Sequence, residues 1–160
     1  MNTNPDGYRE HNEHKEYTHR VLRVFIVFFV AKKLKMNPEA IISIIIEEAL
    51  YLHRTIGPGM LENVYKTCLA YRLKTRGLMV EVEKPVPVYF EDIKMECGYR
   101  ADIVVENLVV VDTKTIEAIE SLHIAQVLTY LQFLKLRHGL ILNFYSYKMK
   151  DGIKRVLRGY

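Results

Sequence analysis

The sequence predicts an α/β protein in which helices flank a mixed β-sheet, and three observations lead to this fold class. The spacing of apolar residues is helical at first, changes to a period of two, and becomes helical again before two last apolar stretches. The 160 residues, 49% of them hydrophobic, suffice for one domain with a sizeable core. Cys68 and Cys97 form no C-x-x-C pair, which favours buried thiols in a reducing, intracellular setting over a zinc ribbon or a disulfide scaffold.

Three helices are expected from the capping and breaking residues around the helical segments. Asn37 and Pro38 are typical of a helix start, and Gly57-Pro58-Gly59 breaks the chain after the first helix. Gly77 is placed to end the second helix. A third, long helix separates the apolar strands. The expected helices span residues 38–53, 60–76 and 117–136.

Strands are expected where apolar and polar residues alternate or where short apolar runs lie between turn signals. Pro85 and Pro87 interrupt the early strands and predict a sheet edge without a partner. The stretch from Leu108 to Thr113 is almost continuously apolar, which is typical of a central strand buried on both faces. The expected strands span residues 80–83, 85–90, 94–97, 99–105, 108–113, 139–145 and 153–157.

Residues 1–35 differ from the rest and are expected to lie outside the domain, which then covers residues 36–160. They carry three of the four units of net positive charge, so this charge is weak support for a nucleic-acid partner. The apolar run from Val21 to Ala31 is about half the ~20 residues of a membrane-spanning helix, and Arg23 interrupts it. It lacks the cleavage pattern of a signal peptide, and Met36 provides an alternative start. We therefore expect no membrane span and a cytoplasmic location.

Charged residues at two apolar strands form the candidate catalytic site. Asp102 interrupts one apolar strand, and Asp112 and Lys114 end the next one on a common face, because side chains alternate with a period of two. Charges at such positions are costly unless they are paired or bind a metal ion. A surface carboxylate that is neutralised by a neighbouring lysine is the alternative interpretation.

The connection between these two strands decides whether the carboxylates share a face. A strict two-residue turn at Glu106-Asn107 would place Asp102 opposite Val111 and turn Asp112 to the other face. A connection of three residues, or a bulge, would place Asp102 opposite Asp112. Opposed carboxylates repel, and a divalent cation such as Mg²⁺, which prefers hard oxygen ligands, would remove that repulsion.

Two of the helices direct further polar side chains toward the expected core. Glu62 lies at the margin of the buried face of its helix, whereas His123, Gln126 and Tyr130 share the inner face of the third helix. Buried amide and imidazole groups need hydrogen-bond partners. Satisfied core positions are therefore the alternative to a catalytic role, and we favour this alternative for His123.

Several short motifs occur in an order that resembles the GxxExxY protein family, which is placed in the PD-(D/E)XK nuclease superfamily. The resemblance extends over residues 37–160 and leaves residues 1–35 uncovered. Several motifs in the same order make it specific at the level of the family. The motifs are Gly59-Met60-Leu61-Glu62-Asn63-Val64-Tyr65, Tyr99-Arg100-Ala101-Asp102, Val111-Asp112-Thr113-Lys114, and His123-Ile124-Ala125-Gln126 followed by Thr129-Tyr130-Leu131.

The resemblance implies a restriction-endonuclease-like core and a set of catalytic residues. Asp102 would be the first acid, with Asp112 and Lys114 as the second acid and the lysine. Glu62 would be the acid carried by a helix, and Gln126 the polar residue of the third helix. The second acid is commonly Glu in this family, so the shorter side chain here draws the carboxylate back by one methylene. The residues expected to support the site are Tyr65, His123 and Tyr130.

The predicted function is that of a Mg²⁺- or Mn²⁺-dependent nuclease that hydrolyses phosphodiester bonds of DNA or RNA. Asp102, Asp112 and the backbone carbonyl of Thr113 would hold the metal ion, with Glu62 as an additional or water-mediated ligand. The alternative is a catalytically silent binding or scaffolding module. The near-neutral charge of residues 36–160 and the lack of a basic strip interleaved with aromatic residues favour this alternative. DNA or RNA as substrate, endo- or exonucleolytic cleavage and formation of a homo-oligomer are left open.

Overall fold

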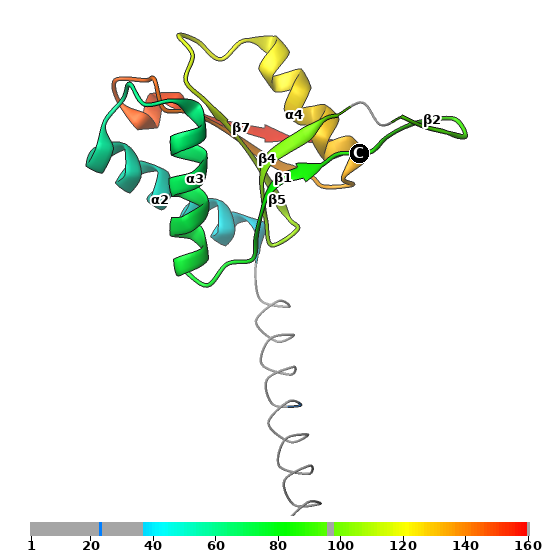
Figure 1. Cartoon of the computed structure of the whole chain (residues 1–160), viewed down its shortest axis with the longest axis horizontal. Coiled ribbons are helices and arrows are strands. Elements are labelled where there is room, and N and C mark those ends of the chain that lie inside the picture. The colour runs from blue at the N-terminus through cyan, green and yellow to red at the C-terminus, as the bar shows by residue number, and fades with distance from the viewer. Residues whose placement is uncertain (1–22, 24–36, 96–97, 160) are drawn as a thin grey trace, which may run out of the picture. The chain divides into compact units, whose positions relative to one another are not determined.

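The computed structural model describes residues 23, 37–95 and 98–159 (Figure 1). The chain divides into two units, residues 1–37 and 38–160, and the helices and strands considered below belong to the second. Except for Arg23, the expected N-terminal extension lies outside the described residues, and so does Cys97. Among the residues described, no helix has both the length and the apolar character needed to cross a membrane.

The order of helices and strands confirms the order expected from the sequence, with one 3₁₀ turn added. The elements are α2 (Pro38–Ile56), α3 (Glu62–Thr75), β1 (Val80–Pro85), β2 (Val88–Phe90), β3 (Ile93–Met95), β4 (Arg100–Val105), β5 (Val109–Lys114), α4 (Ser121–Phe133), β6 (His138–Asn143), η1 (Met149–Gly152) and β7 (Ile153–Leu157). The expected start of the third helix at residue 117 is wrong. The Asn143 side chain holds the backbone of Ile116 in a loop through hydrogen bonds of 3.1 and 2.7 Å, so the helix begins only at Ser121.

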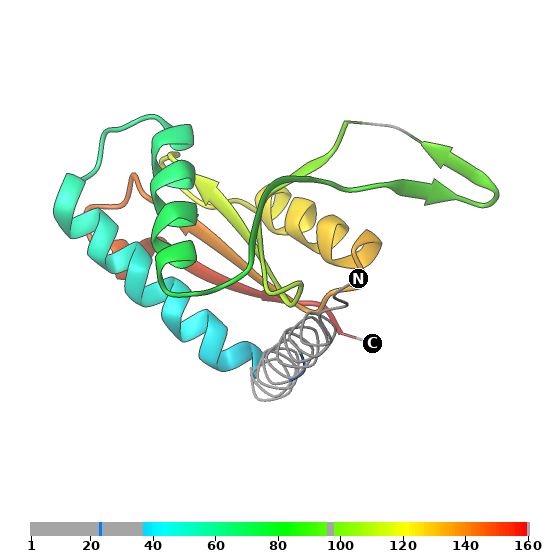
Figure 2. The ribbon, with the colours of Figure 1, turned by 60° about the horizontal axis from the view of Figure 1, so that its bottom comes forward.

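A five-stranded mixed sheet in the order β1-β4-β5-β6-β7 forms the centre of the second unit. The neighbours β5 and β6 are parallel and are connected by α4, whereas the other neighbouring strands are antiparallel. Helices α2 and α3 lie on one side of the sheet and α4 lies on the other (Figures 1 and 2). The predicted α/β fold is therefore confirmed. Strands β2 and β3 form a separate two-stranded sheet that extends away from the main sheet (Figure 2).

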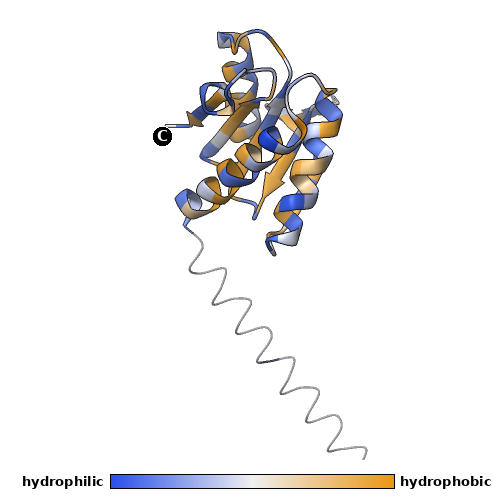
Figure 3. Cartoon of the chain, turned by 90° about the vertical axis from the view of Figure 1, so that its left-hand side faces the viewer, coloured by the Kyte–Doolittle hydropathy of each residue, from blue (hydrophilic) through white to orange (hydrophobic). Residues whose placement is uncertain are grey.

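The central strands consist largely of hydrophobic residues (Figure 3). Their buried side chains form the core between the two layers of helices. Strand β5, in the middle of the sheet, is buried from Val109 to Thr113, as its apolar sequence predicts. Under α4, Val127 and Leu131 pack with Val110 and Ile141 of the central strands. Because this packing fixes α4 against the sheet, it also fixes the polar side chains that α4 carries.

An ion-pair cluster around one buried glutamate joins α2 to α3 and to its C-cap residue, Arg76. Glu48 of α2 is only 1% exposed and accepts hydrogen bonds from Arg72 Nε at 2.7 Å and from Arg76 Nη1 at 2.6 Å. Charge-assisted hydrogen bonds are roughly twice as strong as neutral ones, and the loss of either arginine would leave the buried carboxylate less compensated. The cluster therefore fixes the orientation of α3, whose first turns carry Glu62 and Lys66.

We expect Gly139→Ala to destabilise the protein by about 1–3 kcal/mol, because α4 closely approaches β6 at this glycine. An added Cβ would lie 2.6 Å from Val127 Cγ1 and 3.3 Å from Leu131 Cδ1, and a valine in a helix has little rotamer freedom. Urea unfolding followed by circular dichroism would measure the change. Gly159→Ala is the control, because nothing lies within 4 Å of its added carbon. Equal stability of the two variants would contradict the expected packing.

Candidate active site

The β4–β5 hairpin brings together two carboxylates of the candidate site, Asp102 and Asp112, which form an acid pair. The register of the ladder places Asp102 opposite Asp112, one position beyond its last pair. The connection has three residues, 106–108, of which Glu106 and Asn107 adopt left-handed backbone conformations with φ of +52° and +53°. The connection therefore has the odd length that the sequence analysis required for both acids to share a face.

Asp102 is tied to the neighbouring strand through its carboxylate. Its Oδ2 accepts hydrogen bonds from the backbone N–H of Thr113 at 2.9 Å and from Thr113 Oγ1 at 2.7 Å. Its Oδ1 lies 3.6 Å from the Nζ atom of Lys66 on α3. The side chain thus bridges β4 and β5 at the point where the ladder ends, and the bridge fixes the position of its carboxylate.

Asp112 is the most deeply buried carboxylate of the candidate site. It is 2% exposed, and its Oδ2 lies 2.8 Å from Lys114 Nζ but accepts no hydrogen bond of acceptable geometry. Burial raises the pKa of Asp112 to about 6, against the opposing effect of the Lys114 ammonium. The charges of Asp102 and Glu62 also act to raise the pKa of Asp112, with smaller effects than burial.

Lys114 supplies the positive charge next to Asp112. Its Nζ also donates to the backbone carbonyl of Thr113 at 3.4 Å. Burial acts to lower the pKa of Lys114, but the Asp112 carboxylate, with smaller contributions from Glu62 and Asp102, raises it overall. Lys114 is therefore a protonated ammonium at neutral pH, and it faces both Asp112 and the Thr113 carbonyl.

Tyr65 fixes the loop that leads into α3 and its first residue, Glu62. Its buried hydroxyl donates to the Gly57 carbonyl at 2.6 Å and accepts from the Met60 N–H at 3.1 Å. Its ring stacks on Phe144, with 4.3 Å between ring centroids. These contacts place Tyr65 in the support of the loop that leads to Glu62, the first residue of α3.

We expect Tyr65→Phe to destabilise the protein by about 1–3 kcal/mol, because it leaves the Gly57 carbonyl and the Met60 N–H without their buried partner. The stacked ring is retained, so the loss reports the hydroxyl alone. Urea unfolding measures the difference. Tyr71→Phe on the same helix, where the side chain is 67% exposed, is the matched control. A loss of the same size in both variants would contradict this role.

Helix α4 contributes a hydrogen-bonded pair and a capping side chain. Gln126 Nε2 donates to Tyr130 Oη at 2.5 Å, so the partner of this amide is Tyr130 and not Lys114. Burial raises the pKa of Tyr130, the hydrogen bond with Gln126 acts to lower it, and the charge of Asp112 acts to raise it. His123 Nδ1 instead accepts from the Glu120 N–H at 3.0 Å. The imidazole thus caps the start of α4.

The residues of this site fall within a match to a known family. A profile described as the PD-(D/E)XK nuclease superfamily matches residues 39–156. The chain belongs to the PD-(D/E)XK nuclease superfamily. Comparisons with curated proteins and with solved structures gave no significant match. Membership of the superfamily indicates a nucleic-acid substrate, and its nucleases generally depend on a divalent metal ion. The narrower resemblance to the GxxExxY family stays a prediction.

The oxygen atoms at the acid pair of this PD-(D/E)XK domain fit a hard divalent cation. Asp102 and Asp112 lie opposite each other, Asp112 Oδ2 is a buried acceptor without a hydrogen bond, and the Thr113 carbonyl lies beside Lys114. Within residues 37–95 and 98–159, no group of three or more His, Cys, Asp or Glu side chains is arranged to hold a metal ion. The available ligands are thus two carboxylates and a carbonyl, which suits Mg²⁺ because this ion usually retains several waters.

Two charged residues beside Asp102, Lys66 and Glu83, are not among the site residues that the sequence predicts. Lys66 forms an ion pair with Glu83 of β1 and lies 3.6 Å from Asp102 Oδ1. Burial acts to lower the pKa of Lys66, but Glu83 and Asp102 raise it overall. Lys66 follows Glu62 by four residues, so both lie on one face of α3, and this spacing is the signal that could have identified it.

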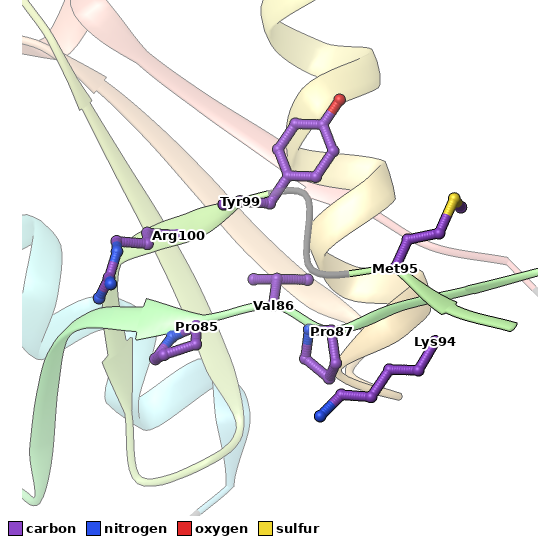
Figure 4. Close-up of a pocket in the computed structure, with 8 residues that line it drawn as sticks. Pro85, Val86, Pro87, Lys94, Met95, Tyr99 and Arg100 are labelled. Carbon is purple, nitrogen blue, oxygen red and sulfur yellow. The ribbon is translucent and has the colours of Figure 1, made fainter.

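A separate cavity of about 390 Å³ lies at the base of the two-stranded β2–β3 sheet (Figure 4). The residues that line it include Pro85, Val86, Pro87, Met95, Tyr99 and Arg100. Neither carboxylate of the acid pair is among its lining residues. The ring of Tyr99 meets the ring of Tyr130 edge-on, with 6.3 Å between centroids, so the cavity lies next to α4 but outside the acid pair.

Proposed function

We propose that this PD-(D/E)XK domain is a divalent-metal-dependent nuclease that hydrolyses phosphodiester bonds of DNA or RNA in the cytoplasm. The observation that carries the proposal is the arrangement of Asp102 opposite the buried Asp112, with Lys114 Nζ 2.8 Å from Asp112 Oδ2. Opposed carboxylates repel each other, so an arrangement of this kind is favourable mainly where a cation is bound.

Asp102, Asp112 and the Thr113 carbonyl would hold Mg²⁺ or Mn²⁺, with Glu62 as an additional or water-mediated ligand. A bound ion of this kind acidifies a water molecule and offsets negative charge on the phosphate. The Asp102 carboxylate is oriented before a cation binds, because Thr113 donates two hydrogen bonds to its Oδ2 atom. The Asp102 carboxylate therefore needs little rearrangement when a cation binds.

Lys114 and Gln126 would act on the water and on the phosphate. The ammonium of Lys114 is charged at neutral pH. It can therefore orient the attacking water by donating a hydrogen bond to a lone pair of that water, and it can offset negative charge on the phosphate oxygens. The Gln126 amide is held by Tyr130, which leaves its second N–H as a donor for a phosphate oxygen. Tyr65 and His123 support the loop before α3 and the start of α4.

A catalytically silent binding module is the second candidate, and one observation favours it. Each carboxylate already has an ammonium nearby, Lys114 at 2.8 Å from Asp112 and Lys66 at 3.6 Å from Asp102. Ion pairs of this kind can neutralise both acids without a metal ion. In that case the protein would bind nucleic acid or another partner without cleaving it.

Cleavage assays on the full chain distinguish the two candidates. Labelled single- and double-stranded DNA and RNA would be incubated with the protein and Mg²⁺, Mn²⁺ or excess EDTA. The nuclease proposal expects cleavage of at least one substrate with Mg²⁺ or Mn²⁺ and none with EDTA. Calorimetric titration with Mn²⁺ is the second measurement. Uncleaved substrates together with no heat of metal binding would overturn the proposal in favour of the silent module.

A further inference from the structure

Glu83 has a backbone conformation that is unusual for its place in a strand. It lies in the middle of β1 with φ of +53°, a left-handed conformation that is uncommon for residues other than glycine. The β1–β4 register runs through Val82 and Lys84 but omits the pair of Glu83 and Asp102 between them. Local strain of this kind persists where the surrounding structure imposes it, and it is frequent at functional sites. We therefore expect contacts of Glu83 with neighbouring residues to stabilise this conformation.

The Glu83 carboxylate shares one ammonium group with Asp102, and Arg100 Nη1 donates to the Glu83 backbone carbonyl at 3.3 Å. Lys66 Nζ is hydrogen-bonded to the Glu83 carboxylate, and its side chain is only 12% exposed. The same nitrogen lies 3.6 Å from Asp102 Oδ1, which is within ion-pair distance but beyond a hydrogen bond. Lys66 is thus held by Glu83 and only attracted by Asp102.

We propose that Glu83 is a positioning residue that holds the Lys66 ammonium beside Asp102 and thereby keeps Asp102 Oδ1 open to a divalent cation. This inference rests on the proposed function. Asp102 Oδ2 is occupied by the two hydrogen bonds from Thr113, so Oδ1 is the oxygen on which the two cations compete. Without Glu83, the ammonium would close onto Asp102 and exclude the metal ion. Without Lys66, the ammonium that lies 3.6 Å from Asp102 Oδ1 would no longer compete with the metal ion for this oxygen.

A double-mutant cycle on the full chain tests this competition by calorimetric titration with Mn²⁺. Glu83→Gln is expected to weaken Mn²⁺ binding about tenfold, and Lys66→Met to tighten it several-fold. The double variant is expected to bind as Lys66→Met does, to within about twofold, because no ammonium remains to be held away. A simple loss of one negative charge would instead weaken binding equally in both backgrounds. Equal effects in the two backgrounds would therefore overturn the inference.

The ion pair of Glu81 and Lys84 on the same strand provides the matched control. Its Nζ–Oε1 distance is 2.7 Å, and the side chains are 46% and 22% exposed. Glu81→Gln and Lys84→Met make the same charge changes and are expected to alter Mn²⁺ affinity less than twofold. Circular dichroism would establish that each variant folds, and Glu83→Asn, which tolerates a left-handed backbone, replaces Glu83→Gln if that variant does not.

The outcomes separate this inference from the function on which it rests. Measurable Mn²⁺ binding by the wild type, with a coupled response to Glu83→Gln and Lys66→Met, supports both. Measurable binding with no coupling overturns the role of Glu83 and leaves the nuclease proposal standing. No binding by the wild type in the presence of uncleaved substrate overturns the nuclease proposal and, with it, the inference.

Discussion

Asp112→Asn is expected to lower the rate of Mg²⁺-dependent phosphodiester cleavage by at least about a thousandfold and to leave the fold intact. Asparagine has nearly the same volume as aspartate, so the buried position in β5 stays filled. The amide carries no charge, so a divalent cation loses one of its two carboxylate ligands and Lys114 loses its ion-pair partner. Initial rates on the best substrate, together with circular dichroism spectra, measure both parts of the expectation.

Asp92→Asn is the matched control for this variant. Asp92 lies in the exposed turn between β2 and β3, so the substitution makes the same change in charge away from the acid pair. Its cleavage rate is expected to stay within about twofold of the wild type. Residual cleavage by Asp112→Asn at the level of this control would show that the acid pair does not carry the reaction.

The second large effect concerns the dependence of stability on pH. Burial raises the pKa of Asp112 from 3.8 to about 6, so between these values the folded state binds more protons than the unfolded state. The protonation of Asp112 therefore adds most to the free energy of unfolding at acidic pH. This contribution is lost as the pH rises toward 6 and is absent at higher pH. Relative to Asp112→Asn, the wild type is expected to lose about 2 kcal/mol of unfolding free energy between pH 4 and pH 7.

Urea unfolding of both proteins at pH 4, 5, 6 and 7 measures this difference. The comparison with Asp112→Asn cancels the titration of most groups that the two proteins share, and metal-free buffer keeps the cation from masking the effect. A difference that does not change with pH would mean that Asp112 titrates near its ordinary value. An opposite slope would mean that Lys114 stabilises the carboxylate more than burial destabilises it.

The order of the elements could be predicted from the sequence because it depends on local patterns. The continuous apolar run of β5 identified the central strand, and the glycines at 57, 59 and 77 marked the ends of helices. The separate β2–β3 sheet could not be predicted, because it depends on tertiary contacts. Val86 is buried in the core under α4 and donates to the Tyr99 carbonyl at 2.9 Å, which separates the strands on either side of it.

The acid pair could be predicted only up to a condition on the register. The alternation of side chains placed Asp112 and Lys114 on one face. The length of the β4–β5 connection could not be predicted in the same way, because Glu106 has a left-handed backbone although it is not a glycine. A residue remote in the sequence, Met79, holds Glu106 in this conformation. The Glu106 N–H donates to the Met79 carbonyl at 2.9 Å, and Glu106 Oε1 accepts from the Met79 N–H at 2.8 Å. The ion pair of Lys66 with Glu83 could not be predicted from strand periodicity, because Glu83 departs from regular strand geometry.

The three-residue connection between β4 and β5 also determines where the chain tolerates insertions. An added residue that is taken up as a longer loop leaves the register unchanged, so Asp112 stays opposite Asp102. An added residue that makes the strands slip by one position turns Asp112 away from Asp102. The turn between β2 and β3 is free of this constraint, because neither strand carries a carboxylate of the acid pair. Insertions at residues 106–108 are thus compatible with the acid pair only where the loop takes them up without a slip of the register, whereas insertions at Glu91-Asp92 carry no such condition.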